Sequence, residues 1–224
     1  MFELPKAESL ESQQDLIQQL NSVNFPPIKI LLTGVGKVAK GAKEMLDAMG
    51  IKKVSVKDYL HQTFADSVYC MIDVLDYNKR KDGEIIDNQD FYNHPEEYIS
   101  DFGRFAAVTD YFIAGHFYGD GSPYLFTRED AKQDDFNIKY VADISCDIDG
   151  PVASTIRSSS IENPIYGYDP KTESEVDFKD PNAIVVMAVD NLPCELPKDA
   201  SEGFGEMFLE HVIPAFFNDD KDGI

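Results

Sequence analysis

The stretch that decides the fold reads ILLTGVGKVAKG and covers residues 30–41. An apolar run ends where the spacing Gly34-x-Gly36-x-x-Ala39 begins. An amphipathic pattern that is typical of a helix then continues to Met49. This order predicts the strand, glycine turn and helix of a dinucleotide-binding βαβ unit.

Each small residue of this turn has a physical task in such a unit. Gly34 lets the strand turn sharply, Gly36 lets the backbone approach a pyrophosphate, and Ala39 lets the helix pack close to the strand. The free N–H groups at the start of the helix then face the anion. The residues predicted to bind the cofactor at this turn are Gly34, Val35, Gly36, Lys37, Val38 and Ala39.

Length and composition limit the class of protein. The 224 residues suit one large domain or one domain with appendages. No apolar run approaches the roughly 20 residues needed to span a membrane, and the first residues lack the pattern of a secretory signal. The three cysteines are far apart and odd in number, which argues against a disulfide framework. These features predict a cytoplasmic location.

The charge is strongly acidic, with 41 acidic and 20 basic residues and a formal net charge of −21. Such a surface repels phosphate backbones, so we expect no nucleic acid partner. A dinucleotide must then be held by backbone N–H groups and a few local cations, because the overall field opposes its binding.

Three parts are expected along the chain. Residues 1–27 read as an N-terminal helix and linker, residues 28–200 as a dinucleotide-binding domain, and residues 201–224 as a C-terminal helix and acidic tail. Within the middle part, strand patterns alternate with helix patterns, including a second strand at 53–57 and a helix that opens at Pro95. The predicted fold class is α/β, a Rossmann-type, doubly wound and mostly parallel sheet with flanking helices.

Several segments take the interpretation beyond a generic dinucleotide fold. They are HPEEYIS (94–100), ADISCD (142–147), DNLPCELP (190–197), SPYLFTREDA (122–131) and TGVGKVAKGA (33–42). Together these segments resemble the lysine-ketoglutarate reductase and saccharopine dehydrogenase family, within the wider alanine dehydrogenase and transhydrogenase superfamily. The resemblance runs from about Ile28 to Phe217, in the order that the family shows.

The resemblance implies NAD(P)-dependent hydride transfer at a carbon bearing nitrogen, with a small amino acid or oxo acid as substrate. In the family the substrate domain precedes the dinucleotide domain, whereas only about 27 residues precede the first strand here. The chain therefore resembles the cofactor half, and a separate substrate domain or a homo-oligomer would cover its terminal helices. The alternative is a non-catalytic nucleotide-binding or interaction module that retains the fold.

The resemblance also implies residues on the nicotinamide side. Asp147 matches the second acid of the family's Asp-x-x-x-Asp spacing, and it follows a strand end, where open α/β sheets bind ligands. It could equally cap the turn made by Asp149 and the residues after it. Asn191 and Leu192 match the loop beside the nicotinamide or form a plain turn, and Ile144 covers one nicotinamide face or packs in the core.

The spacing of one acid bears on cofactor choice. Asp58 lies 22 positions after Gly36, close to where an acid meets the adenosine ribose, and this favours NAD. The neighbouring Lys57 could instead pair with the 2′-phosphate of NADP. Lys37 and the lysines one and two turns later could simply form the solvated face of the helix.

The histidines and cysteines carry a weaker signal. His116 ends a predicted strand, and we interpret it as a satisfied core or surface histidine in preference to a catalytic one. The remaining histidines and cysteines lack the close pairs that a zinc site usually shows, so the sequence predicts no metal site.

Overall fold

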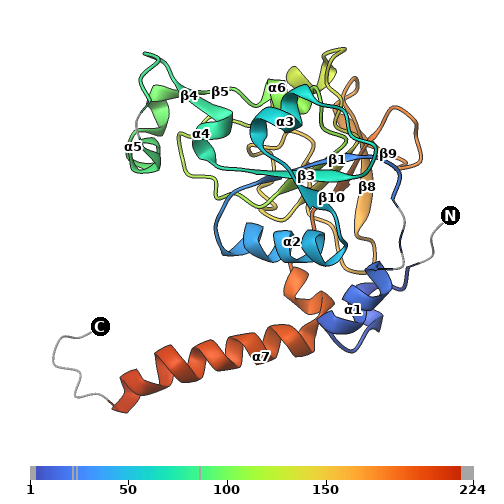
Figure 1. The fold of residues 1–224 in the computed structure, drawn as a ribbon, viewed down its shortest axis with the longest axis vertical. Helices are drawn as coiled ribbons and strands as arrows, with labels where there is room; N and C mark the ends of the chain where they lie inside the picture. The colour runs from blue at the N-terminus through green and yellow to red at the C-terminus, as the bar shows by residue number, and fades with distance from the viewer. Residues whose placement is uncertain (1–3, 22, 24, 86, 218–224) are drawn as a thin grey trace.

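The computed structural model describes residues 4–21, 23, 25–85 and 87–217. At its centre lies an eight-stranded sheet in the order β2-β3-β1-β6-β7-β10-β8-β9, with helices on both faces (Figure 1). The predicted fold class, a mostly parallel Rossmann-type α/β sheet, is confirmed. The acidic tail expected at the C-terminus falls in residues 218–224, outside the described residues.

Six strands run parallel, and two antiparallel strands close one edge. The parallel strands are β2 (Lys52–Lys53), β3 (Val68–Ile72), β1 (Lys29–Thr33), β6 (Tyr111–Ala114), β7 (Tyr140–Asp143) and β10 (Ile184–Met187). β8 (Ile165–Asp169) pairs antiparallel with β10, and β9 (Ser174–Val176) pairs antiparallel with β8. The carboxyl ends of the parallel strands therefore meet at one edge.

The core divides into two apolar layers, one on each face of the sheet. Ile30 and Leu32 belong to the layer that α2 (Lys37–Ala48) covers, whereas Leu31 belongs to the opposite layer. The opposite layer also contains residues of α3 (Val56–His61), α4 (Val74–Tyr77) and α6 (Gly103–Ala106). Burial on both faces explains why β1 reads as a continuous apolar run.

The predicted second strand is too long. It ends at Lys53 because the next residues begin a helix: the Ser55 hydroxyl accepts the N–H of Asp58 at 3.1 Å and so caps α3. Moreover, β3 and not β2 is hydrogen-bonded to β1, so β2 lies at the outer edge of the sheet.

The helix predicted from Pro95 is also wrong. A single 3-10 turn (Pro95–Glu97) leads into β5 (Tyr98–Ser100), which pairs antiparallel with β4 (Asn78–Arg80). The Tyr98 hydroxyl donates to Asp90 on α5 (Asn88–Asn93) at 2.7 Å, and its ring packs edge-on against Phe91. These contacts with α5 favour a small β ribbon over a helix at this position.

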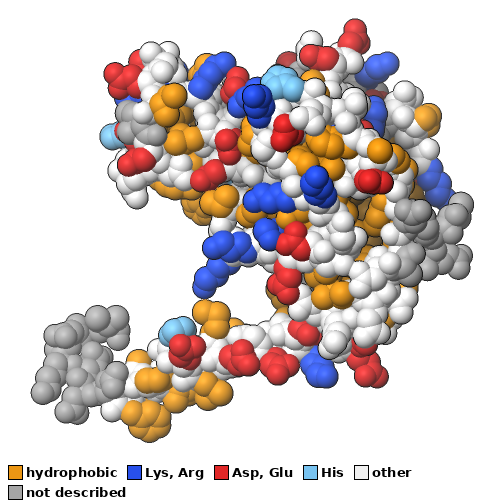
Figure 2. All heavy atoms as spheres, viewed as in Figure 1, with side chains coloured by type: hydrophobic (Ala, Val, Ile, Leu, Met, Phe, Trp, Pro, Cys, Tyr) orange, Lys and Arg blue, Asp and Glu red, His pale blue; other side chains and the backbone are white. Residues whose placement is uncertain are grey.

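The last helix leaves the body of the protein. α7 (Pro197–Met207), a π-helical turn (Phe208–Val212) and a 3-10 turn (Ile213–Phe217) form one rod. In Figure 1 the rod begins near α1 (Gln13–Leu20) and projects away from it. None of its described residues is buried. Phe204, Leu209 and Phe216 are 70%, 66% and 73% exposed, and apolar side chains line the rod in Figure 2. The rod therefore exposes apolar side chains along its described length.

The described chain contains further short turns: η1 (Ala7–Ser9), η3 (Asp130–Lys132) and η4 (Leu192–Glu195). Among the described helices, none has the length and apolar character required to cross a bilayer.

We expect Gly34→Ala to destabilise the protein by about 2 kcal/mol or more, because Gly34 has a φ of +92° and a Cβ there would lie 2.6 Å from the Gly115 carbonyl oxygen. Gly41→Ala is the control. Gly41 lies inside α2 with open space where the new methyl group would stand, so the same change should stabilise by about 0.5–1 kcal/mol. Urea denaturation of both variants measures this, and equal effects would contradict the assigned constraint.

Candidate functional site

The glycine turn joins the ends of three neighbouring strands. The Gly34 N–H donates to the Ile72 carbonyl at the end of β3 at 2.9 Å. On the other side, Gly34 lies against the backbone of Gly115 and His116, which follow β6. The turn therefore holds the carboxyl ends of β3, β1 and β6 together.

Gly36 and Ala39 differ in what surrounds them. A Cβ on Gly36 would meet no atom within 4 Å, and its φ of −78° is open to any residue. The fold itself therefore does not require glycine there, and the position of that Cβ is open space. Ala39 is fully buried, and a Cβ on Gly115 would lie 3.3 Å from the Ala39 Cβ. A small residue at position 39 is thus needed for α2 to pack on the end of β6.

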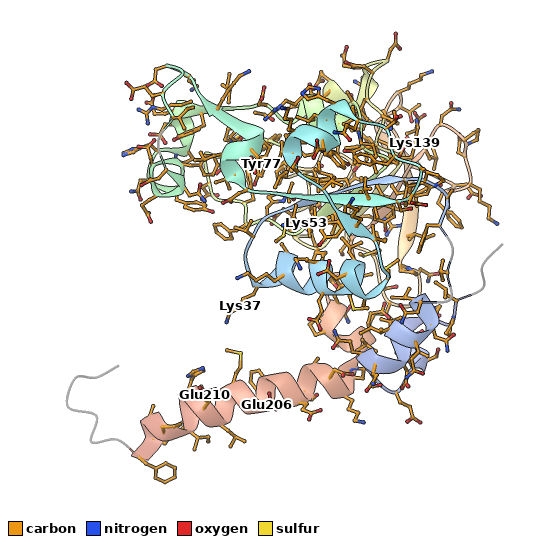
Figure 3. All side chains as sticks on the ribbon, in the orientation of Figure 1. Lys37, Lys53, Tyr77, Lys139, Glu206 and Glu210 are labelled. Carbon is orange, nitrogen blue, oxygen red and sulfur yellow. The ribbon has the colours of Figure 1, made fainter. Side chains whose placement is uncertain are left out.

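The start of α2 is electrostatically open to an anion. Its N-cap is Gly36, which supplies no side-chain hydrogen bond, and its first turn holds no acidic residue. Lys37 extends from this end of the helix (Figure 3), and Lys40 is also exposed. Lys43 instead forms an ion pair with Asp47. Unpaired helical N–H groups and adjacent cations favour a phosphate group at this position.

The turn after β7 is built by Asp143, which is fully buried. Its carboxylate accepts the hydroxyls of Ser145 and Thr155 at 2.6 Å each and the N–H of Cys146 at 3.1 Å. The backbone of Cys146 has a φ of 53°, in the left-handed region that non-glycine residues rarely adopt. Asp143 therefore satisfies the donors of this strained turn.

Asp147 lies in the same turn with a different environment. Burial, and then the charge of Asp143, raise the pKa of its carboxyl group above the ordinary value. Within the described chain, no hydrogen bond or ion pair engages this carboxylate, because Asp143 caps the turn instead. Asp147 thus stands at the carboxyl end of β7 with its oxygens available, and its catalytic role stays a prediction.

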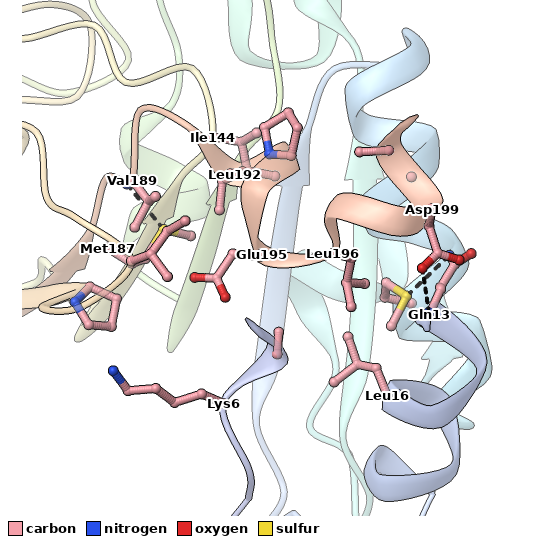
Figure 4. Close-up of a pocket in the computed structure, with 17 residues that line it drawn as sticks. Lys6, Gln13, Leu16, Ile144, Met187, Val189, Leu192, Glu195, Leu196 and Asp199 are labelled. Atoms are coloured by element: carbon pink, nitrogen blue, oxygen red, sulfur yellow. Dashed lines mark hydrogen bonds between the residues drawn. The ribbon is translucent and has the colours of Figure 1, made fainter. Parts of the chain in front are cut away.

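A cavity of about 880 Å³ lies on the α2 face of the sheet, near the ends of β7 and β10. Its wall is almost entirely apolar and includes Ile144, Met187, Val189 and Leu192 (Figure 4). α1 and the first turn of α7 close the other side, where the Gln13 N–H donates to Asp199 at 3.0 Å. Two residues predicted for the nicotinamide side, Ile144 and Leu192, are therefore brought together. Asn191 is exposed at the start of η4.

Asp58 lies on α3, in a separate environment. One of its carboxylate oxygens accepts the Ser55 hydroxyl at 2.8 Å, and the other accepts the Gln62 side-chain amide at 2.6 Å. The ammonium of Lys29, the first residue of β1, donates to the Tyr59 carbonyl. α3 is thus tied to the amino end of β1, and the role of Asp58 at a ribose stays a prediction. The neighbouring Lys57 is exposed.

His116 is interpreted from the sequence as a satisfied histidine, and the structure shows a different environment. The side chain is 7% exposed, and its Nδ1 lies 2.9 Å from the Thr33 hydroxyl. Its Nε2 is buried without a hydrogen-bond partner in the described structure. Only one ring nitrogen is therefore satisfied, directly beside the glycine turn. Its position two residues past the buried end of β6 was the only signal in the sequence.

Comparison with known proteins gives a consistent relationship. The chain is 26% identical over 219 residues to the mitochondrial alpha-aminoadipic semialdehyde synthase of Rattus norvegicus, covering 86% of this chain and 23% of that protein. The alpha-aminoadipic semialdehyde synthase of Arabidopsis thaliana is also 26% identical, over 227 residues, 92% of this chain and 21% of that protein. The resemblance to the lysine-ketoglutarate reductase and saccharopine dehydrogenase family is confirmed.

The part of each relative that the chain matches limits what the similarity implies. The chain spans about a fifth to a quarter of the length of these relatives. A search of protein-family models finds no match. The relationship supports an amino-acid dehydrogenase-like domain, and the activity of the whole relatives does not follow from it directly.

We expect His116 to make stability depend on pH. Burial lowers the pKa of His116 to about 4, from an ordinary value of 6.5. As the pH falls below 6.5 the unfolded chain binds a proton that the folded chain refuses until about pH 4, so the folded state loses stability across this window. Over it, the free energy of unfolding should fall by up to about 3 kcal/mol more in the wild type than in His116→Gln. Urea titrations at several pH values measure this difference, and parallel pH profiles would contradict it.

Proposed function

We propose that the chain binds a nicotinamide dinucleotide at the carboxyl edge of its sheet and acts as the cofactor domain of an amino-acid dehydrogenase. The observation that carries this proposal is the start of α2, where an uncapped helix end meets the open space above Gly36. The similarity to the alpha-aminoadipic semialdehyde synthases supports the same class of domain.

The residues at the turn fit a pyrophosphate. The N–H groups of Lys37, Val38 and Ala39 have no intrahelical acceptor, as in the first turn of any α-helix. The macrodipole of α2 adds positive potential, and Lys37 and Lys40 add two cations to a protein of net charge −21. Binding through backbone groups suits this acidic protein, because it requires few positive side chains.

The nicotinamide side would be formed by residues after β7 and β10. The bound cofactor would accept or deliver a hydride at a carbon bearing nitrogen. Ile144 and Leu192 would pack against its ring and exclude water, and Asn191 would contact it from the start of η4. Asp147, whose pKa is raised by burial, would orient the nitrogen of the substrate and stabilise positive charge that develops there.

The substrate would be a small amino acid or oxo acid, and its remaining contacts would come from another domain or another copy of the chain. The projecting rod of α7 supports such a partner, because exposed apolar side chains lie along it. Patches of this kind mark interaction sites in soluble proteins. We also propose NAD as the cofactor in preference to NADP, and a cytoplasmic location.

Titration with NADH and NADPH, followed by nicotinamide fluorescence, tests the proposal. We expect saturable binding by the wild type and a loss of roughly tenfold or more in affinity for Gly36→Asp, which places a carboxylate in the pyrophosphate position. Gly205→Asp is the charge-matched control, because Gly205 lies on α7 with open space around it, and its affinity should be unchanged.

Thermal melting of all three proteins separates lost binding from lost folding. Absence of binding to either dinucleotide by folded wild-type protein would contradict the proposal. Equal affinities for Gly36→Asp and wild type would move the dinucleotide away from the glycine turn.

A further inference from the structure

The observed order of the strands brings the end of β3, and not the end of β2, beside the glycine turn. β3 pairs in parallel with β1, with Thr33 opposite Ile72, and the Gly34 N–H donates to the Ile72 carbonyl. The residue after Ile72 is Asp73. Because paired strands lie about 4.8 Å apart, Asp73 follows β3 next to the point where Gly34 follows β1.

In dinucleotide-binding sheets, the acid that accepts the ribose hydroxyls stands at the end of the strand adjacent to the glycine-turn strand. Here β3 is that strand, and β2, which leads to Asp58, is one strand further out. We infer that Asp73, and not Asp58 as the sequence predicts, accepts the 2′-hydroxyl of the adenosine ribose and thereby selects NAD over NADP. This inference rests on the proposed dinucleotide site.

The carboxylate of Asp73 is held in place but not saturated. One oxygen accepts the Val74 N–H at 2.7 Å, and the other accepts the Asn88 side-chain amide at 2.6 Å. Within the capping box of α4 the carboxylate also accepts the backbone N–H of Asp76. An ionised carboxylate offers about four acceptor positions, so these three bonds leave one for a ribose hydroxyl. Asp73 is partly exposed, and its own N–H donates to Asp76 at 2.9 Å within a capping box. α4 and α5 therefore fix this carboxylate together.

The local charge favours a hydroxyl over a phosphate. Asp73 and Asp76 lie in the same helical turn, and the described chain shows no ion pair that neutralises either carboxylate. Arg104 donates to the backbone carbonyl of Asp76, while its guanidinium pairs with Asp101. A 2′-phosphate placed at Asp73 would meet like charges, whereas a 2′-hydroxyl would donate a hydrogen bond.

Asp58 supplies a matched comparison within the same chain. Both acids lie in the first turn or at the cap of a short helix, and each accepts an amide side chain, from Gln62 or from Asn88. They differ in position: α3 is tied to Lys29 at the amino end of β1, whereas Asp73 follows the carboxyl end of β3.

The test compares Asp73→Asn with Asp58→Asn in titrations with NADH and NADPH. Asparagine caps helices about as well as aspartate, so Asp73→Asn should keep α4 while removing the charge. We expect the wild type to prefer NADH, Asp73→Asn to reduce that preference roughly tenfold or more, and Asp58→Asn to retain it. Should Asp73→Asn fail to fold, Asp73→Ser, which also caps a helix, gives the same measurement.

The outcomes distinguish failure of this inference from failure of the proposed function. Wild-type protein that binds neither dinucleotide contradicts the proposed function itself. A wild type that binds but prefers NADPH overturns the role of Asp73. So does a preference that shifts in Asp58→Asn instead, or an Asp73→Asn variant that weakens both dinucleotides equally.

Discussion

The contact between Gly34 and the backbone of Gly115 is the constraint on which the rest of the site depends. The two backbones approach so closely that a single added carbon would overlap the Gly115 carbonyl. This approach fixes β1 against β6, and Ala39 then lets α2 settle onto the same strand end. The start of α2 is thereby held at the carboxyl edge, where a phosphate group can meet its free N–H groups.

Local patterns predicted the elements that local chemistry determines. The strand, turn and helix from residue 28 to 49 follow from an apolar run, two glycines and an amphipathic period, all within one contiguous segment. The pairing of β3 with β1 does not follow from such patterns, because it depends on contacts between distant segments. Likewise, Tyr98 and the residues around it resemble a helix by spacing, and their contacts with Asp90 and Phe91 draw them into a strand.

The same distinction applies to the site. The glycine turn itself was predictable, because its shape rests on backbone geometry that the spacing of small residues reveals. The sequence also placed two acids at the end of β7 and just beyond it, but only the structure shows that Asp143 caps the turn and leaves Asp147 unengaged. The apolar cavity could not be predicted, because α1 and α7 close it from opposite ends of the chain. The half-satisfied ring of His116 likewise depends on Thr33, 83 residues earlier.

The most direct measurement is a titration of ¹⁵N-labelled protein with NADH, followed by the amide resonances of the backbone. Because we place the pyrophosphate on the free N–H groups of α2, the amides of Gly36, Lys37, Val38 and Ala39 should show the largest saturable shifts. The amide resonances of the α7 rod should not shift. Large shifts confined to another part of the chain, or none at the start of α2, would contradict this placement of the dinucleotide.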